Sequence, residues 1–388
     1  MTGDAPPRAE PLKLSTPPGA LDDLRGRLRG ARWPDAHEDA GWTEGTDLDY
    51  LRTLVAYWEN GFNWEAEQAA LNRFAHHRAV IDGIGIHFVH APAAGGGGLP
   101  IVLTHGWPDS FWRYLKVIPL LTDPGAYGAD PADAFDVVVP SMPGYGYSDR
   151  PRTPGTNAMR VADLWSALMT DVLGFDRFAA AGGDIGSAVT RFLGLNHADR
   201  VVAIHRTDAG VPVYGGDRAE LGDEERAYFD EVARWAASEG AYAAVHRTKP
   251  QTLAYALNDS PIGLAAWIVE KLRAWSDCGG DVETRFTKDE LLTNIMIYWL
   301  TGTIGSSMRM YRDAAQIPLA EHGRPIEVPC GFSFFPADLL RPPRAWVERT
   351  ANVARWAEMP RGGHFAPLEE PELYAEELRT FFRPYRGD

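Results

Sequence analysis

The sequence predicts an α/β fold with a mostly parallel sheet that carries helices on both faces. Three observations predict it. Short apolar strands alternate with helical stretches from about residue 100 onward, a long helical stretch interrupts them between about residues 210 and 322, and a glycine-rich turn joins one strand to the next helix. Such alternation is typical of parallel sheets with crossover helices.

Residues 1–95 are predicted to form an N-terminal extension of helices followed by a hairpin. Apolar residues recur at helical spacing between about residues 17 and 74. Two apolar runs, 79–81 and 86–89, flank the turn signal Asp82-Gly83, which predicts an antiparallel hairpin. We expect the preceding pair, His76-His77, to lie in a solvated loop.

The α/β core is predicted over residues 96–209 and 323–388, with a helical cap, 210–322, inserted between two strands. The expected strands are 101–104, 135–139, 178–181, 201–205, 326–333 and 353–356. The expected cap helices are 223–238, 250–258, 261–275 and 288–313. We expect the cap to cover the carboxyl ends of the strands, where open α/β sheets bind ligands.

Composition excludes several classes of protein. The formal net charge is −15 and no strong basic cluster is present, which argues against a nucleic-acid partner. The two cysteines, Cys278 and Cys330, supply neither a disulfide framework nor a metal-ligand pattern and fit a reducing cytosol. The N-terminus has no apolar stretch of the signal-peptide kind. We therefore expect a soluble cytoplasmic protein without a membrane anchor.

The glycine-rich turn, Gly182-Gly183-Asp184-Ile185-Gly186, lies between a predicted strand and a predicted helix. A turn in this position usually presents a serine nucleophile at the top of the sheet. Here the central residue is Asp184, so the sequence predicts a carboxylate nucleophile. The alternative is that Asp184 is only the N-cap of the next helix.

Two further motifs complete a candidate catalytic site. The segment His105-Gly106-Trp107-Pro108 follows an earlier strand, where the N–H of Trp107 can join that of Ile185 in an oxyanion hole. His364 follows two glycines after the last strand, as the third member of a nucleophile–acid–histidine triad. Asp338 is preferred as the acid, and Asp208, at the end of an earlier strand, is its geometric rival.

The sequence resembles the microsomal-type epoxide hydrolases of the α/β-hydrolase superfamily over nearly its whole length. The resemblance is carried by the N-terminal segments 42–47 and 70–74, the His105-Gly106-Trp107-Pro108 loop, the cap segments 248–250, 259–266 and 298–299, and the segments 335–340 and 361–366 around the acid and the histidine. It favours Asp338 over Asp208. It also implies two cap tyrosines that activate an epoxide oxygen, and the family's spacing places them at Tyr242 and Tyr311. Ordinary helix packing is expected for Tyr255, Tyr298 and Tyr374.

The resemblance implies hydrolysis of an epoxide to a vicinal diol through an ester on Asp184, without a metal or organic cofactor. His105, Gly106 and Pro108 are then expected to contribute to substrate binding beside the oxyanion hole. The residue after the nucleophile is usually Trp in this family, and here it is Ile185, so the pocket wall loses an aromatic side chain.

Two alternatives are considered beside the epoxide hydrolase. A haloalkane or haloacid dehalogenase shares the aspartate nucleophile and the histidine, but Ile185 supplies no halide donor. A catalytically inactive binding protein is expected to have lost a member of the triad, and Asp184, Asp338 and His364 are all present.

The substrate is expected to be an apolar, aromatic epoxide of the styrene or vinyl type, because the cap is rich in Trp and Tyr. The sequence also resembles bacterial members of the family from actinomycete enediyne-antibiotic pathways, which implies a role in secondary metabolism. The partners expected are therefore a small-molecule epoxide and water, with a homodimer left open.

Overall fold

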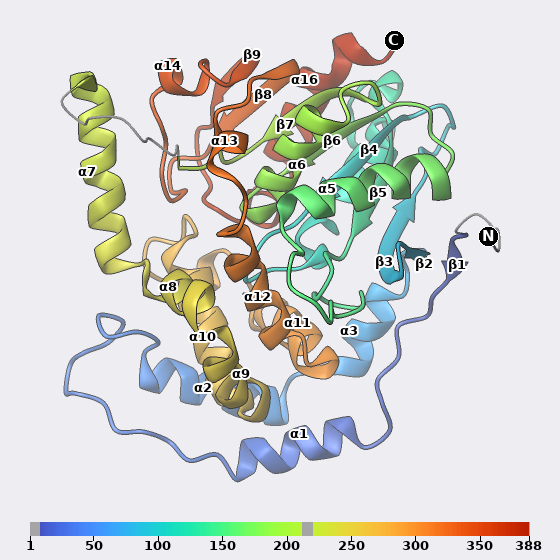
Figure 1. The fold of residues 1–388 in the computed structure, drawn as a ribbon. Helices are drawn as coiled ribbons and strands as arrows, with labels where there is room; N and C mark the ends of the chain where they lie inside the picture. Colours follow the sequence, from blue (N-terminus) through green and yellow to red (C-terminus); the bar gives the residue numbers. More distant parts are fainter. Residues whose placement is uncertain (1–7, 212–219, 388) are drawn as a thin grey trace.

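The computed structural model describes residues 8–211 and 220–387. They form a nine-stranded sheet and the helices around it (Figure 1). The strand order is β1-β2-β3-β5-β4-β6-β7-β8-β9, with β4 to β9 parallel and β1 to β3 antiparallel to their neighbours. The strands are β1 (Glu10–Pro11), β2 (His76–Ile81), β3 (Ile84–Ala91), β4 (Leu99–Thr104), β5 (Phe135–Pro140), β6 (Phe178–Gly182), β7 (Val201–Arg206), β8 (Ile326–Phe334) and β9 (Ala351–Glu358). The predicted parallel sheet is confirmed.

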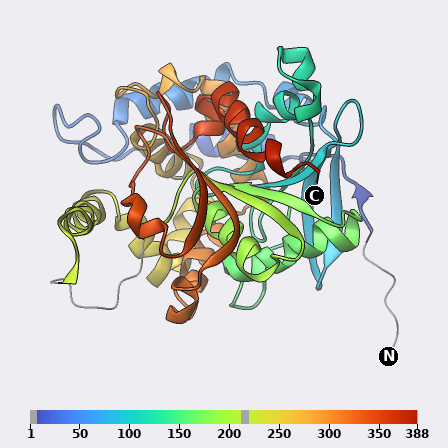
Figure 2. The same cartoon turned by 90° about the horizontal axis from the view of Figure 1, so that it is seen from above.

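Helices cover both faces of this sheet. Seen from above, α5 and α6 lie on one face and α4 and α16 on the other (Figure 2). The strands β6 and β7 are buried along their whole length, as expected for parallel strands covered on both sides. The helices around the sheet are α4 (Val117–Thr122), α5 (Ala158–Ala167), α6 (Ile185–Asn196), α14 (Arg344–Val347), α15 (Ala366–Glu369) and α16 (Pro371–Phe382). Short helical turns are η1 (Phe111–Tyr114), η2 (Pro124–Tyr127), η3 (Pro131–Asp133), η4 (Leu168–Val172), η6 (Val282–Thr284) and η7 (Arg383–Tyr385).

A second group of helices lies between β7 and β8 in the sequence; in Figure 1, α8 to α12 lie beneath the sheet and α7 stands at its left side. Its members are α7 (Asp223–Ser238), α8 (Ala241–Thr248), α9 (Pro250–Asp259), α10 (Pro261–Ala274), α11 (Lys288–Thr301), α12 (Ile304–Ala314) and α13 (Leu319–His322). The single helix predicted over 288–313 is wrong, because Gly302 has a φ of 59° and closes α11 before α12 begins. A glycine in this left-handed conformation commonly ends a helix. The prediction also missed α8.

The N-terminal residues form α1 (Ala20–Arg29), α2 (Leu48–Asn60) and α3 (Trp64–Leu71), followed by the β2–β3 hairpin. The hairpin turn has positive φ at both Asp82 and Gly83, the geometry that matches the twist of the strands. The prediction of a solvated His76-His77 loop is wrong: both residues start β2, and buried His76 bonds through Nδ1 to His87 Nε2 at 2.9 Å. The N-terminal strand β1 covers β2, so this edge of the hairpin is paired.

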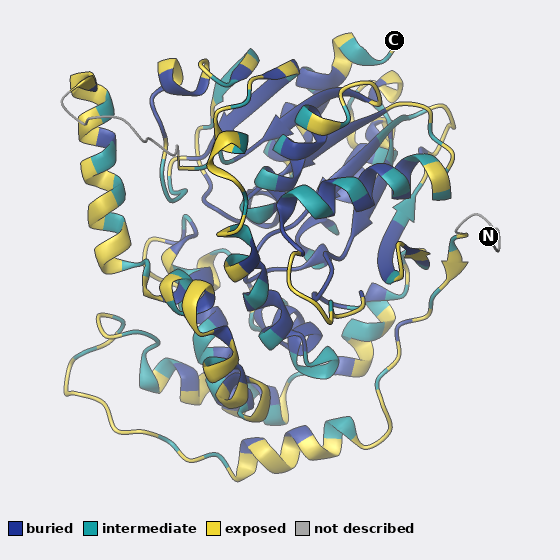
Figure 3. Ribbon diagram, in the orientation of Figure 1, coloured by how far each residue is buried: buried dark blue, intermediate teal, exposed yellow. Residues whose placement is uncertain are grey.

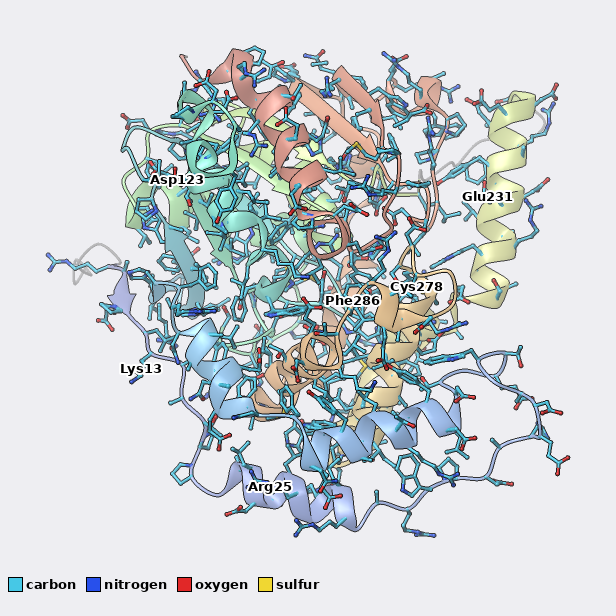
Figure 4. All side chains as sticks on the ribbon, turned by 180° about the vertical axis from the view of Figure 1, so that it is seen from behind. Lys13, Arg25, Asp123, Glu231, Cys278 and Phe286 are labelled. Atoms are coloured by element: carbon cyan, nitrogen blue, oxygen red, sulfur yellow. The ribbon has the colours of Figure 1, made fainter. Side chains whose placement is uncertain are left out.

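Burial follows these layers. The strands and the facing sides of α11 and α12 are buried, whereas α1 and α7 expose most of their residues (Figure 3). From behind, the labelled Phe286 and Cys278 lie between the sheet and the helical layer, while Glu231 marks α7 at one side (Figure 4). The core is therefore continuous from the sheet into the helical layer, and the candidate site lies where the two meet.

Candidate active site

Asp184 lies in a sharp turn between β6 and α6. Its backbone has φ 56° and ψ −130°, an unfavourable conformation for a residue with a Cβ. The glycines allow the strand and helix to meet closely: a Cβ on Gly182 would lie 2.4 Å from the Gly186 carbonyl oxygen, and one on Gly186 would lie 2.0 Å from that of Thr104. Asp184 occupies the N-cap position, but its side chain makes no cap hydrogen bond. The N-cap interpretation therefore does not explain its carboxylate.

The carboxylate of Asp184 is held by main-chain donors. The N–H of Trp107 donates to Asp184 Oδ1 at 2.9 Å, and the N–H of Ile185 helps to lower the pKa of this carboxylate. Gly106 makes this approach possible, since a Cβ there would lie 2.4 Å from the Asp184 Cβ. Of the two N–H groups predicted to form an oxyanion hole, that of Trp107 thus lies on Oδ1 of Asp184 itself, and that of Ile185 acts on the same carboxylate.

His364 lies between the two carboxylates predicted to accompany it. Its Nδ1 is 2.7 Å from Asp338 Oδ1, and its Nε2 is 3.4 Å from Asp184 Oδ2. Burial acts to lower the pKa of His364, but the charges of Asp338 and Asp184 raise it above its ordinary value. Burial likewise acts to raise the pKa of Asp184, but His364 and the N–H groups of Ile185 and Trp107 hold it below its ordinary value. In the resting protein this favours a carboxylate beside an imidazolium.

Asp208, the rival acid, has a different set of partners. Its Oδ1 accepts the N–H of Gly210, and its main-chain carbonyl accepts the hydroxyl of Ser187. Burial and the nearby charge of Asp338 raise the pKa of Asp208 to about 6. The histidine therefore has Asp338, and not Asp208, as its hydrogen-bond partner.

Tyr242 on α8 and Tyr311 on α12 face each other beside this loop. Their ring centroids are 5.8 Å apart, and Tyr242 stacks on Trp107 at 5.2 Å. The Tyr311 hydroxyl is buried and has no hydrogen-bond partner among residues 8–211 and 220–387. Burial and the charge of Asp184 raise the pKa of Tyr242, while burial and Tyr242 raise that of Tyr311. Both phenols therefore stay protonated at neutral pH.

The other tyrosines considered as packing residues divide into two groups. Tyr298 is buried and donates to the Asp109 carbonyl at 2.7 Å, and Tyr374 is also buried. Tyr255 is 73% exposed, so the expectation that it packs in a helix interface is wrong. Its position on the outer face of α9 leaves it in solvent.

The remaining residues of the predicted substrate loop have main-chain partners. His105 is fully buried, with Nδ1 at 2.9 Å from the Gly106 carbonyl and Nε2 accepting the N–H of Met142 at 3.1 Å. The carbonyl of Pro108 accepts from Asn294 Nδ2 at 2.8 Å. The His105 ring thus fixes the loop, while Gly106 is the loop residue that touches Asp184.

A buried ion pair that the sequence analysis missed connects the loop to the histidine. Arg113 pairs with Asp109 at 2.5 Å, Asp109 Oδ1 accepts the N–H of Gly106, and Arg113 Nη2 donates to the main-chain carbonyl of His364 at 2.6 Å. The signal was an acid and a base four residues apart, directly after the loop motif. Together they fix the relative positions of the loop and the histidine.

His246 was also missed as a member of the aromatic cluster. It follows Tyr242 by four residues, so both project from one face of α8. Its ring lies 4.7 Å from that of Trp107 and 4.9 Å from that of Tyr311. Neither ring nitrogen has a hydrogen-bond partner in the described part of the chain, and burial lowers the pKa of His246 to about 3. The imidazole is therefore neutral.

A cavity of about 550 Å³ opens beside Asp184, Ile185 and Tyr311. Among the described residues no cluster of His, Cys, Asp and Glu has the arrangement of a metal site. Within the same residues, no helix combines the length and the apolar character needed to cross a bilayer.

Known proteins match this chain over nearly its whole length. The sequence model described as "Epoxide hydrolase N terminus" matches residues 9–114, and the one described as "alpha/beta hydrolase fold" matches residues 100–237. A protein of Stigmatella aurantiaca whose name includes "epoxide hydrolase" is 42% identical over 97% of this chain and 85% of its own. Epoxide hydrolase 1 of Sus scrofa is 36% identical over 98% of this chain and 90% of its own.

Solved structures agree with these matches. The structure of the Aspergillus niger epoxide hydrolase superposes with a TM-score of 0.84 at 31% identity, covering 98% of this chain and 97% of that one. The fold and the elbow therefore define an α/β-hydrolase. The chain belongs to the microsomal-type epoxide hydrolase family, and it is an epoxide hydrolase. This membership decides against the dehalogenase and the inactive binding protein.

Proposed function

We propose that this enzyme converts an apolar, aromatic epoxide to a vicinal diol through a covalent ester on Asp184. The observation that carries the proposal is the placement of the Asp184 carboxylate: Oδ1 accepts the main-chain N–H of Trp107, and Oδ2 faces His364. One oxygen is thereby fixed, and the other is left as the nucleophile.

In the first step Asp184 Oδ2 attacks a carbon of the strained oxirane, and the C–O bond of the ring breaks. Tyr242 and Tyr311 hydrogen-bond to the epoxide oxygen, and one of them transfers its proton to the developing alkoxide. Their buried, protonated hydroxyls suit this role, because a phenol whose pKa is raised remains a donor at neutral pH.

Ester formation removes the negative charge of Asp184. The pKa of His364 was raised partly by that charge, so it falls when the ester forms, and the imidazolium can return a proton to the tyrosinate. His364 becomes a neutral base at the stage that needs one. Alkylation of Asp184 thus prepares His364 for hydrolysis.

In the second step His364, oriented by Asp338, takes a proton from water, and the resulting hydroxide attacks the Asp184 ester carbonyl. Oδ1 becomes the oxyanion and already accepts the N–H of Trp107; that donor and the N–H of Ile185, the second proposed donor, are each worth about 3 kcal/mol in the transition state. The diol leaves with Oδ2 and takes the remaining proton of the water, which is on the hydroxyl newly bound to the Asp184 carbonyl carbon. This restores the Asp184 carboxylate, while His364 keeps the first proton as an imidazolium.

The aromatic substrate is supported by the rings around the site. Trp107, Tyr242 and Trp275 lie within 6.4 Å of one another by ring centroids, and Tyr311 and His246 complete the cluster. Flat π-faces of this kind favour a styrene-type or vinyl epoxide. A role in secondary metabolism, as in enediyne-antibiotic pathways, belongs to the same proposal and rests on the sequence resemblance. A higher kcat/KM for styrene oxide than for an aliphatic epoxide of equal size is the expected result.

The proposal includes a cytoplasmic enzyme with a small-molecule substrate. Cys278 and Cys330 are both buried and unpaired, which fits a reducing compartment. Cell fractionation tests the location, and light scattering after gel filtration tests whether the enzyme forms a homodimer.

The covalent mechanism is tested by a single turnover with excess enzyme on styrene oxide in oxygen-18 water. The first diol is expected to carry unlabelled oxygen, because that oxygen comes from Asp184. Heavy oxygen in the first diol would show direct attack by water and overturn the ester.

The variant His364→Gln separates the first step, alkylation of Asp184, from the second step, hydrolysis of the ester. We expect it to be alkylated at Asp184 and to stall as the ester, since no base activates water. Intact-protein mass spectrometry after incubation with styrene oxide should show one adduct, and Asp184→Asn, the matched control, should show none. An unmodified His364→Gln protein would contradict the assignment.

A further inference from the structure

The cavity beside Asp184 extends away from the catalytic residues. Its lining includes Asp184, Ile185 and Tyr311 and also residues of α6, α12 and the segment around α14. Its volume is about 550 Å³, more than the oxirane ring needs. Its apolar lining comprises Ala158, Ile185, Ala188, Phe192, Met310, Ala314, Ile317, Trp346, Val347 and Ala351. A substrate bound at Asp184 can therefore place its larger group in this cavity.

One buried cation on the cavity wall, Arg206, has no ion-paired or hydrogen-bonded acid among the described residues, although the charge of Asp208 lies near enough to act on it. Arg206 ends β7, pairs in register with Gly182 of β6, and is 4% exposed. Its Nε donates to Ser187 Oγ at 2.8 Å. Its two terminal nitrogens, Nη1 and Nη2, make no hydrogen bond or ion pair with any acceptor of residues 8–211 and 220–387. A buried guanidinium with two free donors is costly unless something binds them.

The other charged groups on the cavity wall already have partners. Arg191 donates to the main-chain carbonyls of Glu321, His322 and Arg324, and Arg349 pairs with Glu225. Asp208 accepts the Gly210 N–H; burial raises its pKa, and the charge of Arg206 acts to lower it without a direct hydrogen bond between the two side chains. Within the described residues, Arg206 is thus the cavity cation whose terminal nitrogens make no hydrogen bond and can bind a ligand.

We propose that Arg206 binds a carboxylate at the end of the substrate remote from the oxirane, so that the enzyme prefers aromatic epoxides that carry an acid group. A guanidinium with both terminal nitrogens free matches the two oxygens of a carboxylate. The aromatic body then lies along Ile185, which lines the same cavity as Asp184 and Arg206 and is smaller than the Trp usual at this position in the family. This inference rests on attack by Asp184 as proposed above, and it adds the class of substrate.

The test compares two epoxides of nearly equal shape, 4-(oxiran-2-yl)benzoate and 4-isopropylstyrene oxide. The wild-type enzyme is expected to show a kcat/KM about tenfold or more higher for the carboxylate, the usual effect of a charge-assisted hydrogen-bond pair. Arg206→Met, which keeps an unbranched, flexible side chain but removes the charge, should bring the ratio of the two kcat/KM values to about one or below.

Arg349→Met is the matched control, because Arg349 lines the same cavity but already pairs with Glu225. We expect it to keep the wild-type ratio. Equal losses in the two variants would show a general charge effect and overturn the role of Arg206. Equal kcat/KM values for the two epoxides in the wild type would overturn the proposal outright.

A measurement on the wild type alone covers the case in which Arg206→Met does not fold. Inhibition by 4-(1,2-dihydroxyethyl)benzoate should be about tenfold or more tighter than by the diol of 4-isopropylstyrene oxide. Equal inhibition by the two diols would contradict a carboxylate site. If labelling instead shows that neither epoxide forms an Asp184 ester, the proposed mechanism fails, which is distinct from failure of the carboxylate preference.

Discussion

At the scale of single residues, Gly106 and Asp184 depend on each other. The main chain approaches the nucleophile so closely at Gly106 that a side chain there would overlap the Asp184 Cβ and Oδ1, both 2.4 Å away. Main-chain atoms move less easily than flexible side chains, so the displacement would fall on Asp184. The absence of a Cβ at position 106 is therefore a requirement of the carboxylate geometry.

Gly106→Ala is expected to slow alkylation by about a hundredfold or more, since a displacement of about 1 Å at a reacting group has that effect. The rate of adduct formation with styrene oxide, followed by mass spectrometry in a His364→Gln background, measures it. Gly26→Ala in α1 is the control: nothing lies within 4 Å of its Cβ, and the change should stabilise the helix by about 0.5–1 kcal/mol. Unchanged alkylation in Gly106→Ala would refute the steric argument.

The proton on His364 depends on the charge of Asp184. The folded-state pKa of His364 lies above the unfolded value near 6.5. Its proton therefore contributes stability that is fully present below about pH 6.5 and is lost as the pH rises through the folded-state pKa. The same dependence gives a direct prediction for a variant that lacks the charge.

In Asp184→Asn the pKa of His364 should fall, because one of its two carboxylate neighbours is neutral. Titration of histidine ring nitrogens by ¹⁵N NMR measures the shift, and the signal missing from His364→Gln assigns the resonance. A pKa equal to that of the wild type would mean that Asp338 alone sets the protonation of His364, and alkylation would then not change its role.

At the scale of elements, one ion pair ties the β4–η1 segment to the loop that follows β9. Arg113 and Asp109 are both at most 1% exposed, and their hydrogen bonds reach the Gly106 N–H and the His364 carbonyl. These two segments are 251 residues apart in sequence at the Arg113–His364 contact. The relative position of donor loop and base therefore depends on a side-chain pair and not on strand pairing alone.

Arg113→Met is expected to destabilise the protein by about 3–5 kcal/mol, because it leaves Asp109 buried without its partner. Urea unfolding followed by circular dichroism measures the difference. Arg344→Met removes half of an exposed pair with Glu348 and should cost less than about 1 kcal/mol. Similar losses for the two variants would show that the buried pair has no special importance.

At the scale of the whole molecule, the sequence predicted the sheet more reliably than the helical layer. Strands such as β6 and β7 are short, apolar and fully buried, so composition alone marks them. The break at Gly302 was missed because apolar residues continue on both sides of it, and only the backbone conformation distinguishes a helix end from a helical glycine. The α8 helix was missed because it is short.

The candidate site shows the same division. Asp184, His364 and Asp338 stand next to glycines or strand ends. The order of their motifs along the chain was enough to predict that the three form a catalytic triad. Asp109, Arg113, His246 and Arg206 were not predicted, because their importance comes from contacts between distant segments and from missing hydrogen-bond partners. Contacts of that kind appear only when the chain is folded.

The hydrogen bond to Asp184 Oδ1 has a consequence for isotopes over many catalytic cycles. If the Trp107 N–H holds this oxygen throughout, the carboxylate does not rotate, and only the oxygen facing His364 is exchanged with solvent. After prolonged turnover in oxygen-18 water, the peptide containing Asp184 should therefore carry one heavy oxygen and never two. Two heavy oxygens would mean that the carboxylate rotates between cycles and exchanges the positions of Oδ1 and Oδ2. The isotope content of Asp184 therefore reports whether this rotation occurs.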